Sequence, residues 1–389
     1  MPHLKVTPFD SSAIEHKILQ SDIITFRAKA LKGGDELLGV EHGGEEFLLQ
    51  IKPDEKATLV KYDKVTRPLK VNLLKEALDQ VSKDLELEIE SSNIAISNSK
   101  PTLSSEYFKK IEDFEHITSP KEKISVEVGF GSGRHLLHQA KKNPDTLFIG
   151  LEIHTPSAQQ VLKQIELQEL DNIWVVNYDA RLFLEMLPSN VCEQIFVHFP
   201  VPWDKKPHRR VISPSFLDES IRVLRKGGRL ELRTDSDKYF WYSLETFFSV
   251  PKTEVEIRKN EALEVTSKYE ARWRRQEKDI YDVYVKCGEN SEPKVLNIDF
   301  NFNIVKYRKG LEETLPKKAL VFDGYFVHFE RMYKTGNEKL LIKCAFGSFD
   351  RPEHKYILIE ENSCRYFVSP PVKTTVNYEA HQKIMELLS

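Results

Sequence analysis

The chain has 389 residues, of which 40% are hydrophobic and 30% charged, and its formal net charge is −3. A single ordinary core rarely extends over so long a chain, so we expect two or three domains. The near balance of charge excludes a globally basic nucleic-acid-binding protein, and any basic binding surface must be local. No run of residues reaches the roughly 18–20 consecutive apolar positions that a membrane span requires, so we expect no membrane partner.

The cysteines and the first residues of the chain indicate the compartment. The four cysteines lie far apart and form no C-x-x-C pair, and Met1 to Lys5 contain no apolar signal core. Spacing of this kind argues against a zinc knuckle and fits free thiols in a reducing compartment. We therefore expect a cytoplasmic protein that binds no metal and carries no export signal.

Residues 1–100 are predicted to form a β-rich N-terminal extension that ends in a linker. Short β-prone runs alternate with glycine turns, and leucine and valine at helical spacing then predict one helix. A stretch rich in serine and asparagine predicts the linker, and a further helix is expected to lead into the next domain. The ranges, in chain order, are strands at 23–28, 36–40, 46–51 and 58–62, a helix at 71–85, the linker at 91–99 and a helix at 104–114.

A strand that ends in an acid and a glycine turn opens the central domain, expected at 101–290. Residues 126–134 read Val-Glu-Val-Gly-Phe-Gly-Ser-Gly-Arg, and glycines let a backbone pass close to a bound ligand. Dinucleotide-binding folds have G-x-G-x-x-G, where a helix N-terminus faces a pyrophosphate. Here the spacing is G-x-G-x-G, and Glu127 would repel phosphate but favour a cation. S-adenosylmethionine carries an ammonium and a sulfonium, so methyl transfer is favoured over a nicotinamide dehydrogenase or a turn without a cofactor.

Three further apolar runs, at 147–152, 173–180 and 194–200, predict strands that alternate with helices such as 157–170. The first ends at Glu152, where an acid is placed to bind ribose hydroxyls. The next contains Asp179, which we place at the adenine edge. Strand–helix alternation predicts an α/β fold, with a doubly wound, mostly parallel sheet, helices on both faces and ligands at the carboxyl ends of the strands.

A basic, proline-containing loop follows the fourth of these strands. Between Phe199 and Arg210 the prolines hold the backbone extended, Trp203 offers a flat face, and four cations lie within six residues. These are Lys205, Lys206, Arg209 and Arg210. Cations at such a strand end can bind phosphates, and an aromatic ring beside them can stack on an unpaired base. A solvated basic turn with Trp203 packed in the core is an equally open interpretation.

Residues 291–389 are predicted to form a β-rich C-terminal extension. The expected strands are at 303–307, 319–329, 339–346, 356–359 and 365–368, and the expected helix is at 378–388. Neither extension contains a catalytic motif. RNA binding and additional surface or a dimer contact both remain open for these regions, and we expect a monomer or a homodimer.

The basic loop resembles the F-P-D-P-W-x-K-x-x-H-x-K-R-R signature of the TrmB-type tRNA (guanine-N7)-methyltransferases. Further segments resemble that family's motifs in the family's order, across about residues 122–288. They are Glu127 to Gly133 for E-I-G-x-G-x-G, Gly150 to His154 for G-I-E-x-H, Asp179-Ala180 for D-A, Phe216-Leu217 with Val223 to Gly228 for F-L and V-L-K-x-G-G, Thr234-Asp235 for T-D, and Ser267 to Arg272 for T-K-F-E-x-R. A Rossmann-like fold by itself does not require the last motif, so the ordered set is specific.

The resemblance implies a Rossmann-like class I methyltransferase that uses S-adenosyl-L-methionine to methylate a variable-loop guanine, position 46, of tRNA. By position, it implies cofactor binding by Glu127, Gly129, Gly131, Gly133, Glu152 and Asp179. It implies substrate binding by Lys205, Asp235, Ser267, Lys268, Tyr269, Glu270 and Arg272, with Asp235 and Glu270 as the catalytic pair. RNA contacts are implied for Lys206, Arg209 and Arg210. Other interpretations remain for two of these residues, since Tyr269 could be a core residue and Asp235 could cap the helix that follows it.

The chain departs from the family pattern at several positions. Val201 stands where the signature has aspartate, Trp273 stands where the last motif continues with glycine, and the basic loop is about two residues shorter. Guanine N7 already presents a lone pair, so methylation needs no general base, and positioning alone can supply up to ~7–11 kcal/mol. We hypothesise that Val201 leaves activity intact or reduced, because Asp235 and Glu270 can still accept hydrogen bonds from guanine. A catalytically weakened tRNA-binding protein and a methyltransferase with another substrate are the alternatives.

Overall fold

The structure is a computed structural model of the chain. The residues it describes are 2–9, 14–68, 71–95, 106–116, 119, 121–250, 253–262, 264–265, 270, 273, 275–294, 298–303, 305–336, 339–349 and 351–389. The chain divides into two compact units. Leu103–Asn297 form the central unit, and Met1–Thr102 together with Ile298–Ser389 form the flanking unit.

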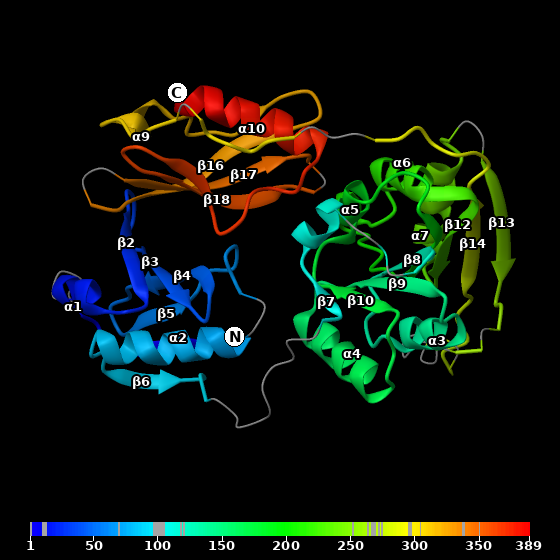
Figure 1. The fold of residues 1–389 in the computed structure, drawn as a ribbon, viewed down its shortest axis with the longest axis horizontal. Helices are drawn as coiled ribbons and strands as arrows, with labels where there is room; N and C mark the ends of the chain where they lie inside the picture. Colours follow the sequence, from blue (N-terminus) through cyan, green and yellow to red (C-terminus); the bar gives the residue numbers. More distant parts are fainter. Residues whose placement is uncertain are drawn as a thin grey trace. The chain divides into compact units, whose positions relative to one another are not determined.

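The central unit is built on a sheet in the order β13-β14-β12-β11-β8-β9-β10-β7 (Figure 1). Its strands are β7 Phe108–Lys109, β8 Lys123–Val128, β9 Thr146–Leu151, β10 Ile173–Val176, β11 Cys192–His198, β12 Leu224–Thr234, β13 Glu254–Lys259 and β14 Tyr281–Lys286. The pairs from β7 through β12 are parallel, whereas β14 runs antiparallel to both β12 and β13. The expected α/β fold with a mostly parallel sheet is therefore confirmed.

Helices cover both faces of this sheet (Figure 1). They are α3 Arg134–Lys142, α4 Thr155–Leu167, α5 Ala180–Phe183, α6 Pro214–Val223 and α7 Asp237–Phe247, with 3₁₀ turns η1 Ile111–His116, η2 Leu184–Met186 and η3 Pro207–Arg209. Side chains of α3 and α4 share one apolar cluster with Phe196 of β11, and those of α5 to α7 share another with Ile195 and Val197. Successive strand residues point to opposite faces, so the two clusters lie on opposite sides of the sheet.

The order of the strands locates a ligand-binding edge. The chain runs from β8 outward to β9 and β10, then returns to place β11 on the other side of β8. In open α/β sheets, ligands bind beyond the carboxyl ends of the strands where the order reverses in this way. The glycine turn follows β8 and the basic loop follows β11, so both of these segments begin at this edge.

The prediction of a helix at 104–114 is wrong for residues 106–114, which are the part that the structure describes. That part contains the short strand β7 and the 3₁₀ turn η1, while residues 104 and 105 lie outside the described ranges. The amide of Val175 donates to the carbonyl of Tyr107 at 2.8 Å, and β7 extends the sheet beside β10. Pairing with an existing strand outweighs the local helical pattern here.

In the flanking unit, the N-terminal and C-terminal regions contribute strands to one sheet. The described strands form an 11-stranded sheet in the order β19-β18-β17-β16-β2-β3-β4-β5-β1-β6, and β15 pairs with β16. They are β1 His3–Val6, β2 Ile24–Ala30, β3 Glu36–His42, β4 Glu45–Lys52, β5 Thr58–Tyr62, β6 Ile89–Ser92, β15 Leu320–Val321, β16 Phe326–Lys334, β17 Leu340–Gly347, β18 Glu353–Ile359 and β19 Cys364–Phe367. The two regions meet where β2 pairs with β16, so regions far apart in sequence complete one fold.

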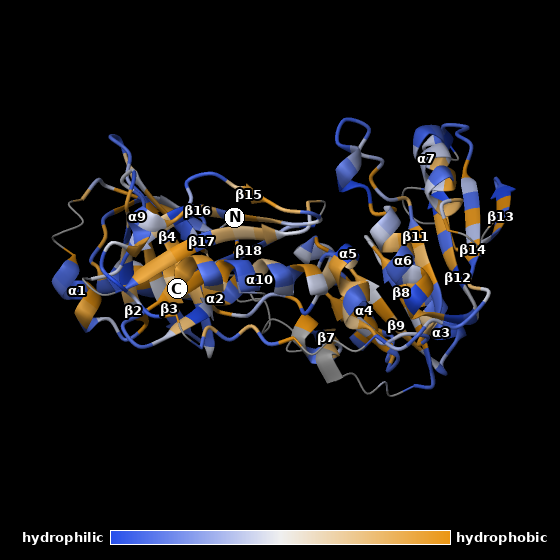
Figure 2. Cartoon of the chain, turned by 90° about the horizontal axis from the view of Figure 1, so that it is seen from above, coloured by the Kyte–Doolittle hydropathy of each residue, from blue (hydrophilic) through white to orange (hydrophobic). Residues whose placement is uncertain are grey.

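The two halves of this sheet pack against each other and carry helices on their outer faces (Figure 1). The helices are α1 Glu15–Gln20 and α2 Val71–Asp84 on the N-terminal half, and α9 Leu311–Thr314 and α10 Thr375–Leu388 on the C-terminal half. Between the halves lies a third apolar cluster that includes Leu37, Leu48 and Phe367. Within it, the hydroxyl of Tyr356 donates to Asp63 at 3.1 Å. Figure 2 shows that apolar residues concentrate on the strands.

Most of the strands and helices predicted for the flanking regions are present, with two corrections. The range 303–307 forms no strand in its described residues, and 319–329 contains a turn between β15 and the start of β16. Phe302 and Val305 instead pack into the apolar cluster under α10. No described helix is long and apolar enough to cross a membrane.

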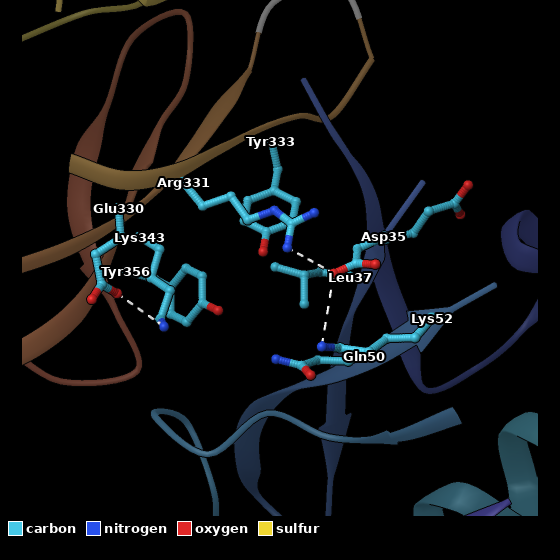
Figure 3. Close-up of a pocket in the computed structure, with 10 residues that line it drawn as sticks. Asp35, Leu37, Gln50, Lys52, Glu330, Arg331, Tyr333, Lys343 and Tyr356 are labelled. Atoms are coloured by element: carbon cyan, nitrogen blue, oxygen red, sulfur yellow. Dashed lines mark hydrogen bonds and ion pairs between the residues drawn. The ribbon is translucent and has the colours of Figure 1, made fainter. Parts of the chain in front are cut away.

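A cavity of about 250 Å³ lies where β16, β17 and β18 meet β3 and β4 (Figure 3). The register of β16 against β17 shifts at Glu330, so this β-bulge allows both Glu330 and the next residue, Arg331, to line the cavity. Lys343 pairs with Glu330 at 2.9 Å, and Arg331 pairs with Asp35 at 2.7 Å. The second pair joins the C-terminal strands to the N-terminal ones, so charged contacts at the cavity help to hold the two halves together.

Candidate active site

The glycine turn after β8 is held in the left-handed region at Gly129, Gly131 and Gly133, with φ of 69°, 53° and 70°. A Cβ on Gly133 would lie 2.3 Å from Cγ2 of Val161, because α3 packs closely against α4 at this point. A Cβ on Gly129 would meet no atom within 4 Å. The third glycine therefore serves helix packing, whereas the first leaves free space beside the backbone at the ligand-binding edge.

Glu152 connects the end of β9 to this turn. Its Oε2 accepts a hydrogen bond from the amide of Gly131 at 2.9 Å, and its Oε1 accepts one from the amide of His154 at 2.9 Å. The side chain is half-buried. A carboxylate with two backbone donors has a fixed orientation and can still accept further bonds, since two oxygens offer about four lone-pair sites.

Asp179 lies three residues beyond the end of β10 and caps α5, so the strand predicted at 173–180 is shorter than expected. Its Oδ1 accepts from the amide of Arg181 at 3.0 Å, and Oδ2 pairs with the Arg181 guanidinium at 2.6 Å. The side chain remains 37% exposed. Both a capping role and a ligand-facing role are therefore compatible with its position.

Glu127 is placed differently from the other two strand-end acids. It is only 3% exposed, and its Oε2 lies 2.8 Å from Nδ1 of His135 on α3. Burial opposes the charged imidazolium, but the neighbouring Glu127 carboxylate outweighs this and raises the pKa of His135. A buried carboxylate requires such a partner. In this structure Glu127 therefore binds α3 to β8 at the start of the turn.

A second His–Glu pair lies beside the first on the same face of the sheet. Nε2 of His198 is 3.0 Å from Oε1 of Glu231, and the His198 and His135 rings are 4.5 Å apart. Burial would raise the pKa of Glu231, but the hydrogen bond and charge of His198 outweigh burial and lower it. No sequence motif pointed to His135, His198 or Glu231. The available signal was polar residues at alternate positions within otherwise apolar strands.

Glu270 lies in a buried ion cluster around Arg233 of β12. The Arg233 guanidinium is 3.1 Å from Oε1 of Glu270 and 3.2 Å from Oδ1 of Asp282, its cross-strand neighbour on β14. Arg233 and Asp282 are 0% exposed and Glu270 is 1% exposed. Burial raises the pKa of Asp282 to about 6. The sequence placed Glu270 at the guanine, whereas the structure places its carboxylate against a buried cation.

Asp235 follows β12 directly and keeps 18% of its side chain exposed. The alternative interpretation of this residue as a helix cap is wrong, because Ser236 is the residue that caps α7 and accepts from the amide of Tyr239. Oδ2 of Asp235 instead pairs with Nζ of Lys278 at 2.9 Å. Of the two acids predicted to meet the guanine, Asp235 is the one with an accessible carboxylate.

The basic loop after β11 presents three of its four cations to solvent. Lys205, Lys206 and Arg209 are exposed, and the Arg209 guanidinium lies 5.2 Å from the centre of the Trp203 ring. The fourth cation, Arg210, is 8% exposed, donates to the carbonyl of Pro202 at 2.8 Å and stacks 4.3 Å from the Tyr242 ring. Arg210 therefore holds the loop against α7 instead of extending into solvent.

Comparison with known proteins identifies the family. Residues 121–283 match the family model described as "Putative methyltransferase". The tRNA (guanine-N(7)-)-methyltransferase of Wolinella succinogenes is 43% identical to this chain over 358 residues, which cover 91% of each protein. Proteins of the same name from Campylobacter fetus and Helicobacter pylori are 41% and 39% identical, covering 95% and 100% of this chain and 95% and 99% of their own lengths. The chain belongs to the tRNA (guanine-N7)-methyltransferase family.

Family membership confirms the resemblance of the central unit, and the similarity also extends over the flanking unit. Four of the residues that the family pattern singles out, Ser267, Lys268, Tyr269 and Arg272, lie outside the described residues. Val201, at the position of the family aspartate, is 59% exposed. In this family member, an exposed apolar side chain therefore occupies the position of an acid at the carboxyl end of β11.

The residues at the ligand-binding edge fit a methyltransferase cofactor chemically. Gly129 leaves room for a ligand close to the backbone, and Glu152 and Asp179 offer accepting oxygens to hydroxyl and amino donors. Both acids follow adjacent parallel strands, β9 and β10, so they lie on one side of the glycine turn. Asp235 and the basic loop follow β12 and β11 on its other side.

Proposed function

We propose that this protein transfers the methyl group of S-adenosyl-L-methionine to N7 of a guanine in tRNA, at position 46 of the variable loop. The observation that carries the proposal is the arrangement at the sheet edge, where the glycine turn separates two strand-end acids from an accessible acid and a basic loop. Membership of the tRNA (guanine-N7)-methyltransferase family supports it.

The cofactor supplies an electrophilic methyl group on a sulfonium. We assign Glu152 to the ribose hydroxyls and Asp179 to the adenine edge, with Gly129, Gly131 and Gly133 forming the backbone cradle. Glu127 and His135 support the turn from β8 and α3. The bond from Glu152 to the Gly131 amide fixes the turn beside the same carboxylate that would hold the ribose.

The acceptor needs orientation more than proton transfer. Guanine N7 carries a lone pair, so in-line attack on a methyl group removes no proton from the base. The Val201 side chain can neither accept a hydrogen bond nor balance the cationic product, so we assign both roles to Asp235, whose carboxylate is partly exposed. We assign Glu270 a supporting role through Arg233, and a guanine contact for it requires that it leave the buried cluster.

The deciding experiment is methyl transfer from labelled S-adenosylmethionine to tRNA that lacks the modification, followed by nucleoside analysis. We expect labelled 7-methylguanosine in the variable loop. Cofactor binding without transfer would favour a tRNA-binding protein that has lost catalysis, which Val201 makes a specific second candidate. Label in another molecule would identify a methyltransferase with a different substrate.

Changing Glu152 to alanine should weaken cofactor binding by roughly 10- to 150-fold, because hydrogen bonds to a charged group contribute about 1.5–3 kcal/mol. The same change removes the acceptor that holds the Gly131 amide, so the turn also becomes less ordered. Calorimetric titration with S-adenosylhomocysteine measures the effect. Glu166→Ala, on the exposed side of α4, is the control, and equal affinities for the two variants would contradict the assignment.

Changing Lys205 or Arg209 to alanine should weaken tRNA binding and make its salt dependence shallower. Each lost phosphate contact reduces the slope of log affinity against log salt by about 0.9 or less. Arg210→Ala is the contrasting variant, because its buried guanidinium should affect the thermal stability of the loop and α7 instead of the slope. Binding isotherms at several salt concentrations test this, and an unchanged slope for Lys205 and Arg209 would refute the RNA contacts.

A further inference from the structure

A lysine outside every motif of the family pattern reaches the proposed acceptor site. Lys278 precedes β14, and its Nζ lies 2.9 Å from Oδ2 of Asp235. The same ammonium lies 3.8 Å from the centre of the Trp273 ring, and the amide of Lys278 donates to the carbonyl of Trp273 at 3.2 Å. The segment thus turns back on itself and holds the lysine between an aromatic ring and the acid.

Stability does not account for this pair. The Lys278 side chain is 42% exposed and that of Asp235 is 18% exposed. An ion pair whose ammonium is this exposed contributes little to folding, because solvent and salt screen it. The first turn of α7 does not need Asp235 either, since Ser236 caps it. What the pair does provide is a fixed orientation for an accessible carboxylate and an adjacent N–H donor at the ligand-binding edge.

The row of atoms that the pair presents matches one edge of guanine. Lys278 offers a donor, and the two carboxylate oxygens of Asp235 offer acceptors beside it. Guanine presents the complementary row, with O6 as acceptor and N1–H and N2–H as donors, which is the edge that cytosine reads in a base pair. N7 lies outside this row, so a guanine held this way leaves its lone pair free for the methyl group.

We propose that Lys278 and Asp235 together read the acceptor base as guanine, with Lys278 donating to O6 and Trp273 holding Lys278 in place. The inference rests on the proposed function and extends it to base selection. Adenine would bring an amino group against the ammonium and an unprotonated N1 against the carboxylate, so both contacts would be unfavourable. Trp273 stands where the family motif has glycine, so the ring that holds the lysine is not part of that motif.

The test compares three tRNAs, carrying guanosine, 6-thioguanosine or inosine at the acceptor position, with the wild-type protein and Lys278→Met. Sulfur accepts hydrogen bonds weakly, so 6-thioguanosine impairs the O6 contact but keeps N1–H and N2–H. Loss of one specific base contact should lower kcat/KM of the wild type by roughly 5- to 150-fold. Lys278→Met should show a similar loss with guanosine and little further loss with 6-thioguanosine. Inosine lacks only the N2 amine and should affect both proteins equally.

Two further variants separate base reading from general effects. Lys278→Arg keeps a hydrogen-bond donor. Compared with Lys278→Met, it should therefore restore part of the preference for guanosine over 6-thioguanosine. Lys259→Met removes a comparable exposed pair, in which Lys259 lies 2.7 Å from Asp279, and should leave that discrimination unchanged.

The inference is overturned if Lys278→Met keeps the full penalty for sulfur. It is equally overturned if the variant only weakens binding of all three tRNAs together and reduces the salt slope, which is the result for a phosphate contact. Absence of methyl transfer by the wild-type protein to the guanosine tRNA would instead overturn the proposed function on which the inference rests.

Discussion

Replacing Arg233 with methionine is expected to lower the free energy of unfolding by about 3–5 kcal/mol, because removal of one partner leaves the opposite charges of a buried cluster uncompensated. Arg233 is fully buried and faces Glu270 and Asp282 at 3.1 and 3.2 Å. It also donates to the carbonyl of Glu261 at 2.9 Å, so the variant would leave that acceptor without its donor. Urea denaturation followed by tryptophan fluorescence measures the change.

Lys286→Met is the control for this prediction. Lys286 lies on β14 and pairs with Glu254 at 3.3 Å, and the two side chains are 53% and 72% exposed. Exposed pairs typically contribute about 0–1 kcal/mol, so the control should remain close to the wild type. Similar losses of unfolding free energy for the two variants would show that burial does not determine how much the Arg233 cluster contributes to stability.

The pH dependence of the Arg233→Met deficit provides a second measurement. Burial raises the pKa of Asp282 to about 6, from an ordinary value of 3.8, even with Arg233 beside it. A carboxyl whose pKa is raised by folding binds more protons in the folded state, so its contribution to stability falls as pH rises through that range. Removing the cation should strengthen this trend. The deficit should therefore be largest above pH 7 and should shrink as the pH is lowered towards 4.

The local sequence pattern was sufficient for the parallel core of the central unit. The apolar runs before Glu127 and Glu152 became β8 and β9, and the helix predicted at 157–170 became α4. Runs of this kind are buried on both faces, and the turns between them contain glycine or an acid at the strand end. The order of the strands was not predicted, although crossover connections leave few arrangements of such a sheet.

The same pattern could not assign the charged residues correctly, because burial depends on what packs against each side chain. Arg210 looks like its neighbours Lys205 and Arg209 in sequence, yet Tyr242 of α7 covers it. Glu270 looks like a free acid until Arg233 of β12 is placed beside it. In each case the partner comes from a distant segment, and composition near the residue carries no information about it.

The flanking regions show the same limit at the level of topology. Most of their strands were predicted from short β-prone runs of residues. The pairing of Tyr333 on β16 with Ala30 on β2, however, joins the N-terminal and C-terminal regions in one sheet. Contacts so distant in sequence leave no local signature, since either strand could have ended its own sheet. The local pattern of residues is therefore the same whether the two β-rich extensions form separate sheets or share one.

Gly133→Ala and Gly129→Ala are expected to have different effects, although the two glycines have nearly equal φ angles of 70° and 69°. Both alanines carry the cost of a left-handed backbone, about 1–2 kcal/mol. At position 133 the new Cβ would also lie 2.3 Å from Val161, and overpacking adds about 1–3 kcal/mol. We therefore expect Gly133→Ala to lose about 2–5 kcal/mol of stability and Gly129→Ala to lose only the backbone contribution.

For cofactor affinity the order is reversed, and Gly129→Ala should have the larger effect. A methyl group on Gly129 would project into space that is free of protein atoms, where we place S-adenosylmethionine, so Gly129→Ala should bind the cofactor much more weakly while remaining folded. Gly133→Ala should bind more weakly only to the extent that it unfolds. Adding Val161→Ala should then recover part of its stability, because the shorter side chain removes Cγ2 from the contact. Calorimetric titration and urea denaturation of the three variants measure both properties, and a Gly129→Ala variant with wild-type cofactor affinity would place the ligand elsewhere.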